Sequence, residues 1–144
     1  QQFNNIRVSS QDFLTVVPNK IYSNVKMILA DPSCSGSGML TNFERDSTEN
    51  STNLHTSLRE YEQAKWNGLT DHEQTRILNL QSFQHTILNH CAKFQALRIV
   101  YSTCSIYSQE NEQVVEMFLR DNPSYCIKTI RGLSTTERGW GPIG

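Results

Sequence analysis

The sequence lacks a long apolar segment, an excess of either charge and a recognisable targeting segment. Its apolar runs are only a few residues long, whereas a membrane-spanning helix needs roughly 20. The 13 Lys and Arg residues nearly balance the 14 Asp and Glu residues, so the net charge of −1 does not by itself indicate a polyanionic partner. No charged and then apolar leader is visible. We therefore expect a single intracellular domain with no membrane partner.

The sequence also lacks closely spaced cysteines. The closest pair, Cys91 and Cys104, is 13 residues apart, which excludes a Cys-x-x-Cys metal or redox motif. The four histidines do not form a ligand pair with metal spacing either, so we expect no metal. Free thiols in a reducing compartment fit this pattern better than two disulfides.

A glycine-rich turn after a first strand, which is typical of nucleotide-binding α/β domains, is absent before Ile6. The stretch Ser35-Gly36-Ser37-Gly38 has glycines, but it lacks the lysine and the final Ser or Thr of a Walker loop. A tight turn that uses the backbone freedom of glycine explains it at least as well. The chain is therefore either a fragment or a fold that does not bind a dinucleotide-like ligand in that way.

Short apolar runs predict the strands. The run Val25–Ala30 is nearly continuously apolar, which is typical of a central strand covered on both faces. Arg98–Tyr101 predicts a second central strand. Ile6–Val8 and the alternating segment Tyr125–Ile130 are further strand candidates.

Two amphipathic segments predict helices. Thr70-Asp71-His72-Glu73 is a capping-box pattern, and we expect its helix to end near Lys93. Its apolar residues recur at helical spacing: Ile77, Leu80, Ile87, Leu88, Cys91 and Phe94. Ser108 is expected to cap a second helix that ends at Asn122-Pro123. The predicted buried face of this helix is Val114, Val115, Phe118 and Leu119.

The predicted order of strand, strand, helix, strand, helix, strand indicates an α/β fold with a parallel sheet and covering helices. Right-handed crossovers would place the strand ends that carry Asp31 and Cys104 side by side. The polar segment Asn42–Asn53 predicts a surface loop, and residues 135–144 predict an irregular tail.

The four cysteines divide into two kinds. Cys91 lies on the apolar stripe of a helix and Cys126 lies within a strand candidate, so we interpret both as small buried apolar residues. Cys34 and Cys104 each follow a strand end and have small polar neighbours, which would leave their thiols accessible. The N-terminal dipole of the helix that starts near Gln109 would help to ionise Cys104.

Two aspartates also follow predicted strands. Asp31 comes directly after the central strand, a position that favours ligand contact, although a turn cap is the simpler alternative. The same argument applies more weakly to Asp12.

These residues carry a resemblance. The segments Asp31-Pro-Ser-Cys-Ser-Gly-Ser-Gly-Met39 and Tyr101-Ser-Thr-Cys-Ser-Ile106, the latter followed by Glu110-Asn111-Glu112, resemble the two signature motifs of the Sun-type RNA cytosine-5 methyltransferases. The Asp-Pro-Ser-Cys wording and Arg131-Gly132-Leu133 resemble the branch that methylates large-subunit ribosomal RNA. The resemblance covers roughly residues 11–133.

The resemblance implies a fold and a domain boundary. It implies a partial Rossmann-like class I methyltransferase fold without its first strands and glycine-rich loop. Residues 1–134 would then be the C-terminal part of the catalytic domain. A fragment of this kind could lack activity on its own.

It also implies a reaction and its residues. Cys104 would be the nucleophile that adds to carbon 6 of cytosine, and Cys34 the second thiol that resolves the covalent product. Asp31 would line the pocket for the base and for S-adenosyl-L-methionine, and Asp12 would contact the adenosine part of this cofactor. The implied partner is RNA, with ribosomal RNA expected, and the implied location in a eukaryote is the nucleus or nucleolus.

Two alternatives stay open. A catalytically inactive RNA-binding or ribosome-assembly fragment could keep the same fold. An unrelated α/β domain could carry two cysteines in these positions incidentally. The oligomeric state does not follow from the sequence.

Overall fold

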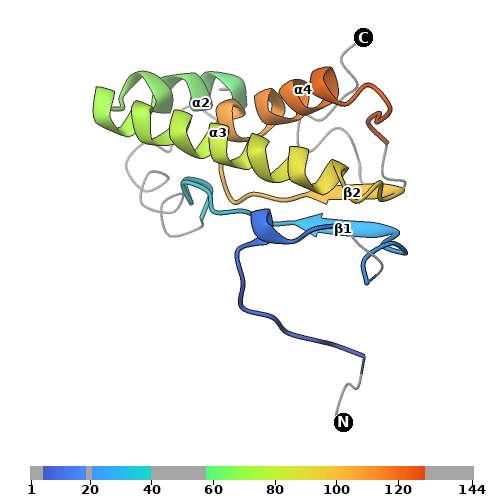
Figure 1. Cartoon of the computed structure of the whole chain (residues 1–144). Helices are drawn as coiled ribbons and strands as arrows, with labels where there is room; N and C mark the ends of the chain where they lie inside the picture. The colour runs from blue at the N-terminus through green and yellow to red at the C-terminus, as the bar shows by residue number, and fades with distance from the viewer. Residues whose placement is uncertain (1–4, 19–20, 40–57, 129–144) are drawn as a thin grey trace.

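The computed structural model describes residues 5–18, 21–39 and 58–128. Its helices α2, α3 and α4 lie on one side of a small sheet, and the N-terminal segment extends away from the other side (Figure 1). The elements follow the order η1 (Phe13–Thr15), β1 (Met27–Ala30), α2 (Leu58–Asn67), α3 (Asp71–Ala92), β2 (Arg98–Tyr101), η2 (Ser108–Glu110) and α4 (Glu112–Asp121).

The sheet consists of two parallel strands among the described residues. Met27 of β1 pairs with Arg98 of β2, and Ala30 pairs with Tyr101, so the two strands end level with each other. This confirms the predicted α/β class and the predicted parallel pairing. The face without helices leaves Leu29 71% exposed, together with Met27 and Val100. Among the described residues the sheet is therefore covered on one face only, and the prediction of a strand covered on both faces is wrong for β1.

Helix α3 begins as the sequence predicts. The Thr70 side chain accepts a hydrogen bond from the Glu73 backbone N–H, and the Glu73 carboxylate accepts one from the Thr70 backbone N–H. These hydrogen bonds hold the pKa of Glu73 below its usual range. The helix ends at Ala92, with Lys93 as its C-cap. The capping box and the end point are both confirmed.

An apolar core joins β1, α3 and α4. We call it the apolar core and define it as Ala30, Leu88, Cys91, Val114 and Phe118. It contains residues from the predicted apolar faces of both helices, and Cys91 is buried as predicted. Burial raises the pKa of the Cys91 thiol to about 11.

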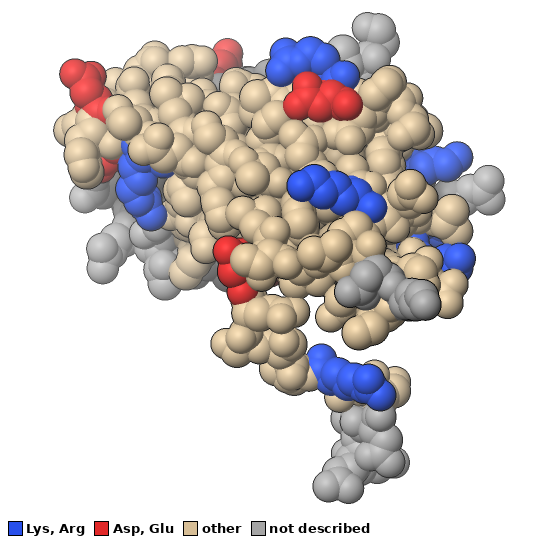
Figure 2. Space-filling model, in the orientation of Figure 1, with Lys and Arg blue, Asp and Glu red and all other residues tan. Residues whose placement is uncertain are grey.

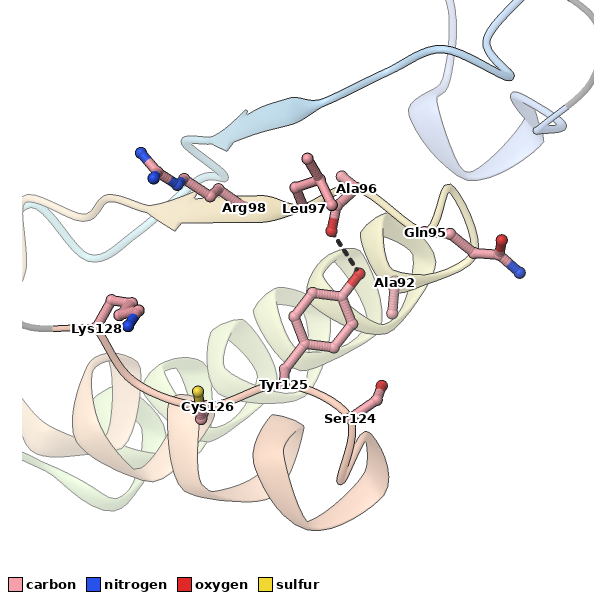
Figure 3. A pocket seen from close by; sticks show the side chains of 9 residues that line it. All are labelled: Ala92, Gln95, Ala96, Leu97, Arg98, Ser124, Tyr125, Cys126 and Lys128. Atoms are coloured by element: carbon pink, nitrogen blue, oxygen red, sulfur yellow. Dashed lines mark hydrogen bonds between the residues drawn. The ribbon is translucent and has the colours of Figure 1, made fainter.

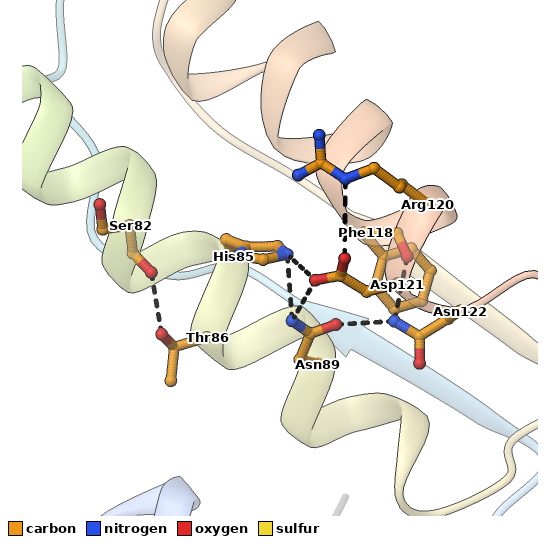
Figure 4. A network of polar contacts seen from close by, with 8 residues as sticks. All are labelled: Ser82, His85, Thr86, Asn89, Phe118, Arg120, Asp121 and Asn122. Carbon is orange, nitrogen blue, oxygen red and sulfur yellow. Dashed lines mark hydrogen bonds and ion pairs between the residues drawn. The ribbon is translucent and has the colours of Figure 1, made fainter.

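A polar network links the outer side of α3 to the end of α4 (Figure 4). The Asp121 carboxylate lies 2.9 Å from Nε2 of His85 and 3.3 Å from Nδ2 of Asn89. Asn122, which caps the C-terminus of α4, donates to Oδ1 of Asn89 at 2.6 Å. The predicted end of this helix at Asn122 is therefore confirmed and held by side chains.

Four predictions about local structure are wrong. Ile6–Val8 is exposed and not a strand, because within the described residues it has no neighbouring strand to pair with. Residues 125–128 do not form a strand either, and Cys126 is exposed. The turn at Ser108 is the 3-10 helix η2, and α4 starts later with Asn111 as its N-cap. Helix α2 was not predicted.

Other predictions fall outside the described residues. These are the surface loop at residues 42–53, the last two positions of the strand candidate that begins at Tyr125, and the irregular tail at residues 135–144. Within the part of the chain that is described, none of the helices is both long enough and apolar enough to span a membrane. Figure 2 shows Lys and Arg side chains dispersed among uncharged residues on one face, without a continuous basic patch.

Candidate active site

The two cysteines predicted to act together lie side by side. Sγ of Cys34 and Sγ of Cys104 are 2.6 Å apart, and the Cys104 backbone N–H donates to the Cys34 sulfur at 3.2 Å. Cys34 follows β1 and is half-buried, whereas Cys104 follows β2 and is exposed. The expected proximity of the two thiols is therefore observed. Their catalytic roles stay predictions.

Close contact between the two cysteine loops explains the glycines. The Gly38 N–H donates to the Cys104 carbonyl at 2.9 Å. A Cβ at Gly38 would lie only 3.0 Å from that carbonyl oxygen, so glycine permits the approach. Gly36 has a φ of +72°, a conformation that glycine adopts at low cost. The tight-turn interpretation of this stretch accounts for both residues.

The surroundings of Cys104 raise its pKa above the ordinary value for a thiol. The hydrogen bond with Cys34 is the main cause, followed by partial burial and by the negative potential of Cys34 and Asp31. The predicted effect of a helix dipole on Cys104 stays a prediction. The helix expected near Gln109 is instead the short 3-10 helix η2, followed by α4 from Glu112, and Thr103 beside Cys104 donates to Asn111, the N-cap of α4.

A buried carboxylate joins the loops that carry the two thiols. Glu110 is 0% exposed. Its Oε1 accepts from the Ser35 backbone N–H at 2.9 Å, next to Cys34. Its Oε2 accepts from the Ser105 hydroxyl at 2.7 Å, next to Cys104. One side chain thus bonds to the residue after each cysteine.

Gln84 of α3 donates a hydrogen bond to this carboxylate. It is fully buried, and its Nε2 donates to Oε1 of Glu110 at 2.9 Å and to the Ser33 carbonyl at 3.0 Å. Cys34 is therefore held on both sides in sequence, through Ser33 and through Ser35. We call this hydrogen-bonded set the polar clamp. It consists of the Ser35 backbone N–H and the side chains of Gln84, Ser105 and Glu110.

The Cys104 loop is also tied to the residues after it. Thr103 donates its hydroxyl to Oδ1 of Asn111 at 2.6 Å, and Nδ2 of Asn111 donates to the Ser105 carbonyl at 3.0 Å. Tyr101 at the end of β2 donates its hydroxyl to the Glu110 carbonyl at 2.6 Å. Burial, with the nearby negative charge of Glu110, raises the pKa of Tyr101.

Sequence reasoning missed the role of the polar clamp. Glu110 was part of a motif, but its polar neighbours gave no sign that it is buried. Gln84 left a signal, because it lies four residues after Leu80 and four before Leu88 on the apolar stripe. A polar residue at that position predicts a buried side chain with hydrogen-bond partners.

The two aspartates differ in their surroundings. Asp31 is exposed directly after β1 and near enough to Cys104 to affect its pKa. The Asp12 side chain accepts from the Leu14 N–H and caps η1. A cavity of about 350 Å³ is lined by Asp31 and by Phe13, the neighbour of Asp12. The structure therefore brings both aspartates to the surroundings of one cavity, and their roles as cofactor ligands stay predictions.

A second cavity, of about 410 Å³, lies where β2 begins, whereas the thiols lie beyond its end (Figure 3). Arg98 and Lys128 line it, and the Tyr125 hydroxyl donates to the Ala96 carbonyl beside it. Cys126 also lines this cavity, whereas none of the predicted site residues does. In the described segments, no group of three or more His, Cys, Asp or Glu residues is placed to hold a metal ion.

Comparison with known proteins gives several relatives. The chain is 39% identical over 143 residues to the 25S rRNA (cytosine-C(5))-methyltransferase rcm1 of Schizosaccharomyces pombe. The matched region covers 98% of this chain and 27% of the relative. It is 39% identical over 137 residues to the 28S rRNA (cytosine-C(5))-methyltransferase of Mus musculus, covering 89% of this chain and 25% of the relative.

A plant relative extends the range of these matches. The 25S rRNA (cytosine-C(5))-methyltransferase NSUN5 of Arabidopsis thaliana is 36% identical over 117 residues, covering 80% of this chain and 18% of the relative. No family model matches the sequence, and no solved structure matches it. The chain spans about a quarter of the length of the first two relatives. The chain is therefore homologous to a segment of the ribosomal RNA (cytosine-C5)-methyltransferases.

Proposed function

We propose that residues 1–134 of this chain are the C-terminal part of the catalytic domain of an enzyme that methylates carbon 5 of cytosine in ribosomal RNA. The observation that carries the proposal is the Sγ–Sγ distance of 2.6 Å between Cys34 and Cys104 at the ends of two adjacent parallel strands. Homology to named ribosomal RNA cytosine methyltransferases supports the substrate. A partial Rossmann-like class I fold is also part of the proposal. Parallel sheets are normally covered on both faces, so a parallel sheet with one uncovered face suits a part of such a fold.

The reaction explains why a thiol is needed. Carbon 5 of cytosine is a weak nucleophile until a group adds at carbon 6 and converts the ring into an enamine. Cys104 is the exposed thiol of the pair, so we assign it this addition as a thiolate. After methylation, a base or water takes the proton from carbon 5, the double bond between carbons 5 and 6 re-forms, and the bond from carbon 6 to sulfur breaks, so that Cys104 leaves as a thiolate. Covalent catalysis thus divides one difficult step into easier ones.

Cys34 is assigned the resolution of the adduct. Its sulfur lies within hydrogen-bond distance of the Cys104 sulfur and accepts from the Cys104 backbone N–H. As a thiol in this position, Cys34 can donate a hydrogen bond to the Cys104 thiolate when Cys104 is expelled, which stabilises the leaving group.

The residues present fit part of an S-adenosyl-L-methionine site. The exposed Asp31 carboxylate suits the positive charge of this cofactor, and the cavity beside it has apolar and aromatic walls that suit an adenine ring. Asp12, next to the cavity-lining Phe13, is assigned to the adenosine part. When bound, the cofactor supplies the electrophilic methyl group. Asp31 and Asp12 orient it relative to Cys104.

The substrate base must be accessible. A cytosine stacked in a helix cannot be reached by Cys104, so the target is unpaired or flipped out of its stack. Cys104 sits in a loop after β2 and is exposed, which suits an extruded base. Action on ribosomal RNA implies a nuclear or nucleolar location in a eukaryote.

Covalent trapping tests the proposal. RNA that contains 5-azacytosine is incubated with the chain extended upstream and with S-adenosyl-L-methionine, and crosslinked protein is mapped by mass spectrometry. We expect a crosslink at Cys104 that is lost in Cys104→Ala. The matched control is Cys126→Ala, another exposed cysteine outside the thiol pair, which should leave the crosslink unchanged. A crosslink that survives Cys104→Ala contradicts the assignment, and no crosslink in the parent protein favours the inactive RNA-binding alternative.

A further inference from the structure

Glu110 connects the two halves of the thiol site. Its carboxylate is 0% exposed and lies between the loop after β1 and the loop after β2. We propose that Glu110 is a positioning residue that sets the separation of the Cys34 and Cys104 sulfurs. Its catalytic meaning rests on the proposed function, whereas its effect on the two thiols does not.

The two oxygens of Glu110 have separate tasks. Oε1 accepts from the Ser35 N–H and from Gln84, both of which hold the Cys34 loop. Oε2 accepts from the Ser105 hydroxyl, which holds the Cys104 loop. The cysteines are 70 positions apart in the sequence, so their distance depends on contacts between these two loops.

The chemistry of these contacts favours a rigid arrangement. A carboxylate that accepts several hydrogen bonds forms charge-assisted bonds, which are shorter and stronger than neutral ones. The 2.7 Å bond from Ser105 is of this kind. Because Glu110 is buried, water cannot replace a lost bond without rearrangement of the loops.

The Ser105 hydroxyl makes the site sensitive to the second oxygen. Ser105 donates its proton to Glu110, and its oxygen accepts from the Tyr107 backbone N–H at 3.0 Å. In Glu110→Gln, an amide N–H₂ in place of Oε2 can donate to the Ser105 oxygen but cannot accept the Ser105 proton, and the hydroxyl turns to another acceptor such as Oγ of Ser37, 3.2 Å away. The substitution keeps the size of the side chain and the bonds of Oε1, and it replaces the short charge-assisted bond to the Cys104 loop with a weaker neutral one.

A thiol–disulfide equilibrium measures the separation without RNA or cofactor. The full 144-residue chain, carrying Cys126→Ser to remove the other exposed thiol, is equilibrated with reduced and oxidised glutathione. Oxidised glutathione takes two electrons from the Cys34 and Cys104 thiols and yields two molecules of reduced glutathione and one protein disulfide. The equilibrium constant gives the effective concentration of one thiol at the other.

We expect Glu110→Gln to lower this effective concentration about tenfold and Glu110→Ala to lower it further, since a displacement of ~1 Å between positioned groups can change their reactivity by two orders of magnitude. The matched control is Phe118→Leu, which weakens packing against Tyr125 toward the far end of α4. We expect this control to lower the melting temperature and to change the effective concentration less than twofold.

The outcomes separate the two proposals. If Glu110→Gln changes the effective concentration no more than Phe118→Leu does, Glu110 does not position the thiols, whatever the RNA crosslink shows. If Glu110→Ala does not fold, Glu110→Gln decides. If the parent protein forms no RNA crosslink but Glu110→Gln shows the tenfold loss, the positioning stands and the proposed function fails.

Discussion

The apolar core and the polar clamp share helix α3 but hold the chain in different ways. The apolar core joins Leu88 of α3, Val114 and Phe118 of α4, and Ala30 of β1. The polar clamp begins one helical turn earlier on α3, at Gln84, and reaches the loops after both strands. Apolar packing is non-directional, whereas hydrogen bonds fix distances and angles. The core therefore brings the strands together, and the clamp fixes the loops that carry the thiols.

This difference separates stability from site geometry. A substitution in the apolar core should cost stability and leave the Cys34–Cys104 separation unchanged in the folded molecules. A substitution in the polar clamp should cost less stability and change that separation. The predictions below test this division, beginning with the largest expected effect.

Leu88→Ala should give the largest loss of stability. Leu88 is 2% exposed at the centre of the apolar core, and its truncation removes buried methyl groups and leaves a cavity. We expect a loss of about 2–5 kcal/mol in the free energy of unfolding, measured by denaturant titration. Under native conditions, the thiol–disulfide equilibrium of the folded fraction should match the parent protein. A changed equilibrium would show that the core also sets the thiol separation.

Gln84→Leu should cost less stability and disturb the thiols. The leucine has a similar volume, but Glu110 and the Ser33 carbonyl each lose a buried donor. We expect a loss of about 1–3 kcal/mol in the free energy of unfolding. The effective concentration of the Cys34–Cys104 pair should fall, while Leu88→Ala leaves it unchanged. If Gln84→Leu leaves the pair intact, the clamp does not extend to α3.

The pH dependence of stability should reveal the buried thiol of Cys91 in the apolar core. Burial raises the pKa of Cys91 to about 11 from an ordinary value of 9.0. A raised pKa means that the folded state retains the proton, so this contribution is present below pH 9.0 and is lost as the pH rises toward 11. We therefore expect stability to fall across this range less steeply in Cys91→Ala than in the parent protein. Parallel curves in urea titrations at several pH values would contradict the buried-thiol explanation.

Alternating apolar and amphipathic segments made much of the fold predictable. The strand Arg98–Tyr101 and the capping box at Thr70 follow from local patterns, and both are observed with the predicted bounds. The strand candidate Ile6–Val8 failed because a strand depends on a partner that local sequence does not reveal. Helix α2 was not predicted. Its Trp66 makes an edge contact with Tyr107, between Cys104 and η2, with ring centroids 5.9 Å apart.

The sequence was sufficient to predict which two cysteines lie together, but not the side chains that hold them in place. Strand ends and small polar neighbours indicated Cys34 and Cys104, and parallel pairing brings those ends together. The burial of Glu110 was not predictable, because it results from the crossing of two loops that are distant in sequence. The raised pKa of Cys104 could not be predicted either, because its main cause is the sulfur of Cys34, which lies 70 positions away in the sequence.

Accumulation of a covalent adduct on ordinary RNA tests the central claim most directly. Cys34→Ala, in the chain extended upstream, is incubated with S-adenosyl-L-methionine and ribosomal RNA that contains normal cytosine, and the protein–RNA adduct is quantified on denaturing gels. If Cys104 forms the adduct and Cys34 resolves it, Cys34→Ala accumulates adduct above the parent level and Cys34→Ala/Cys104→Ala forms none. Equal adduct in the parent, Cys34→Ala and the double variant would contradict the two-thiol site.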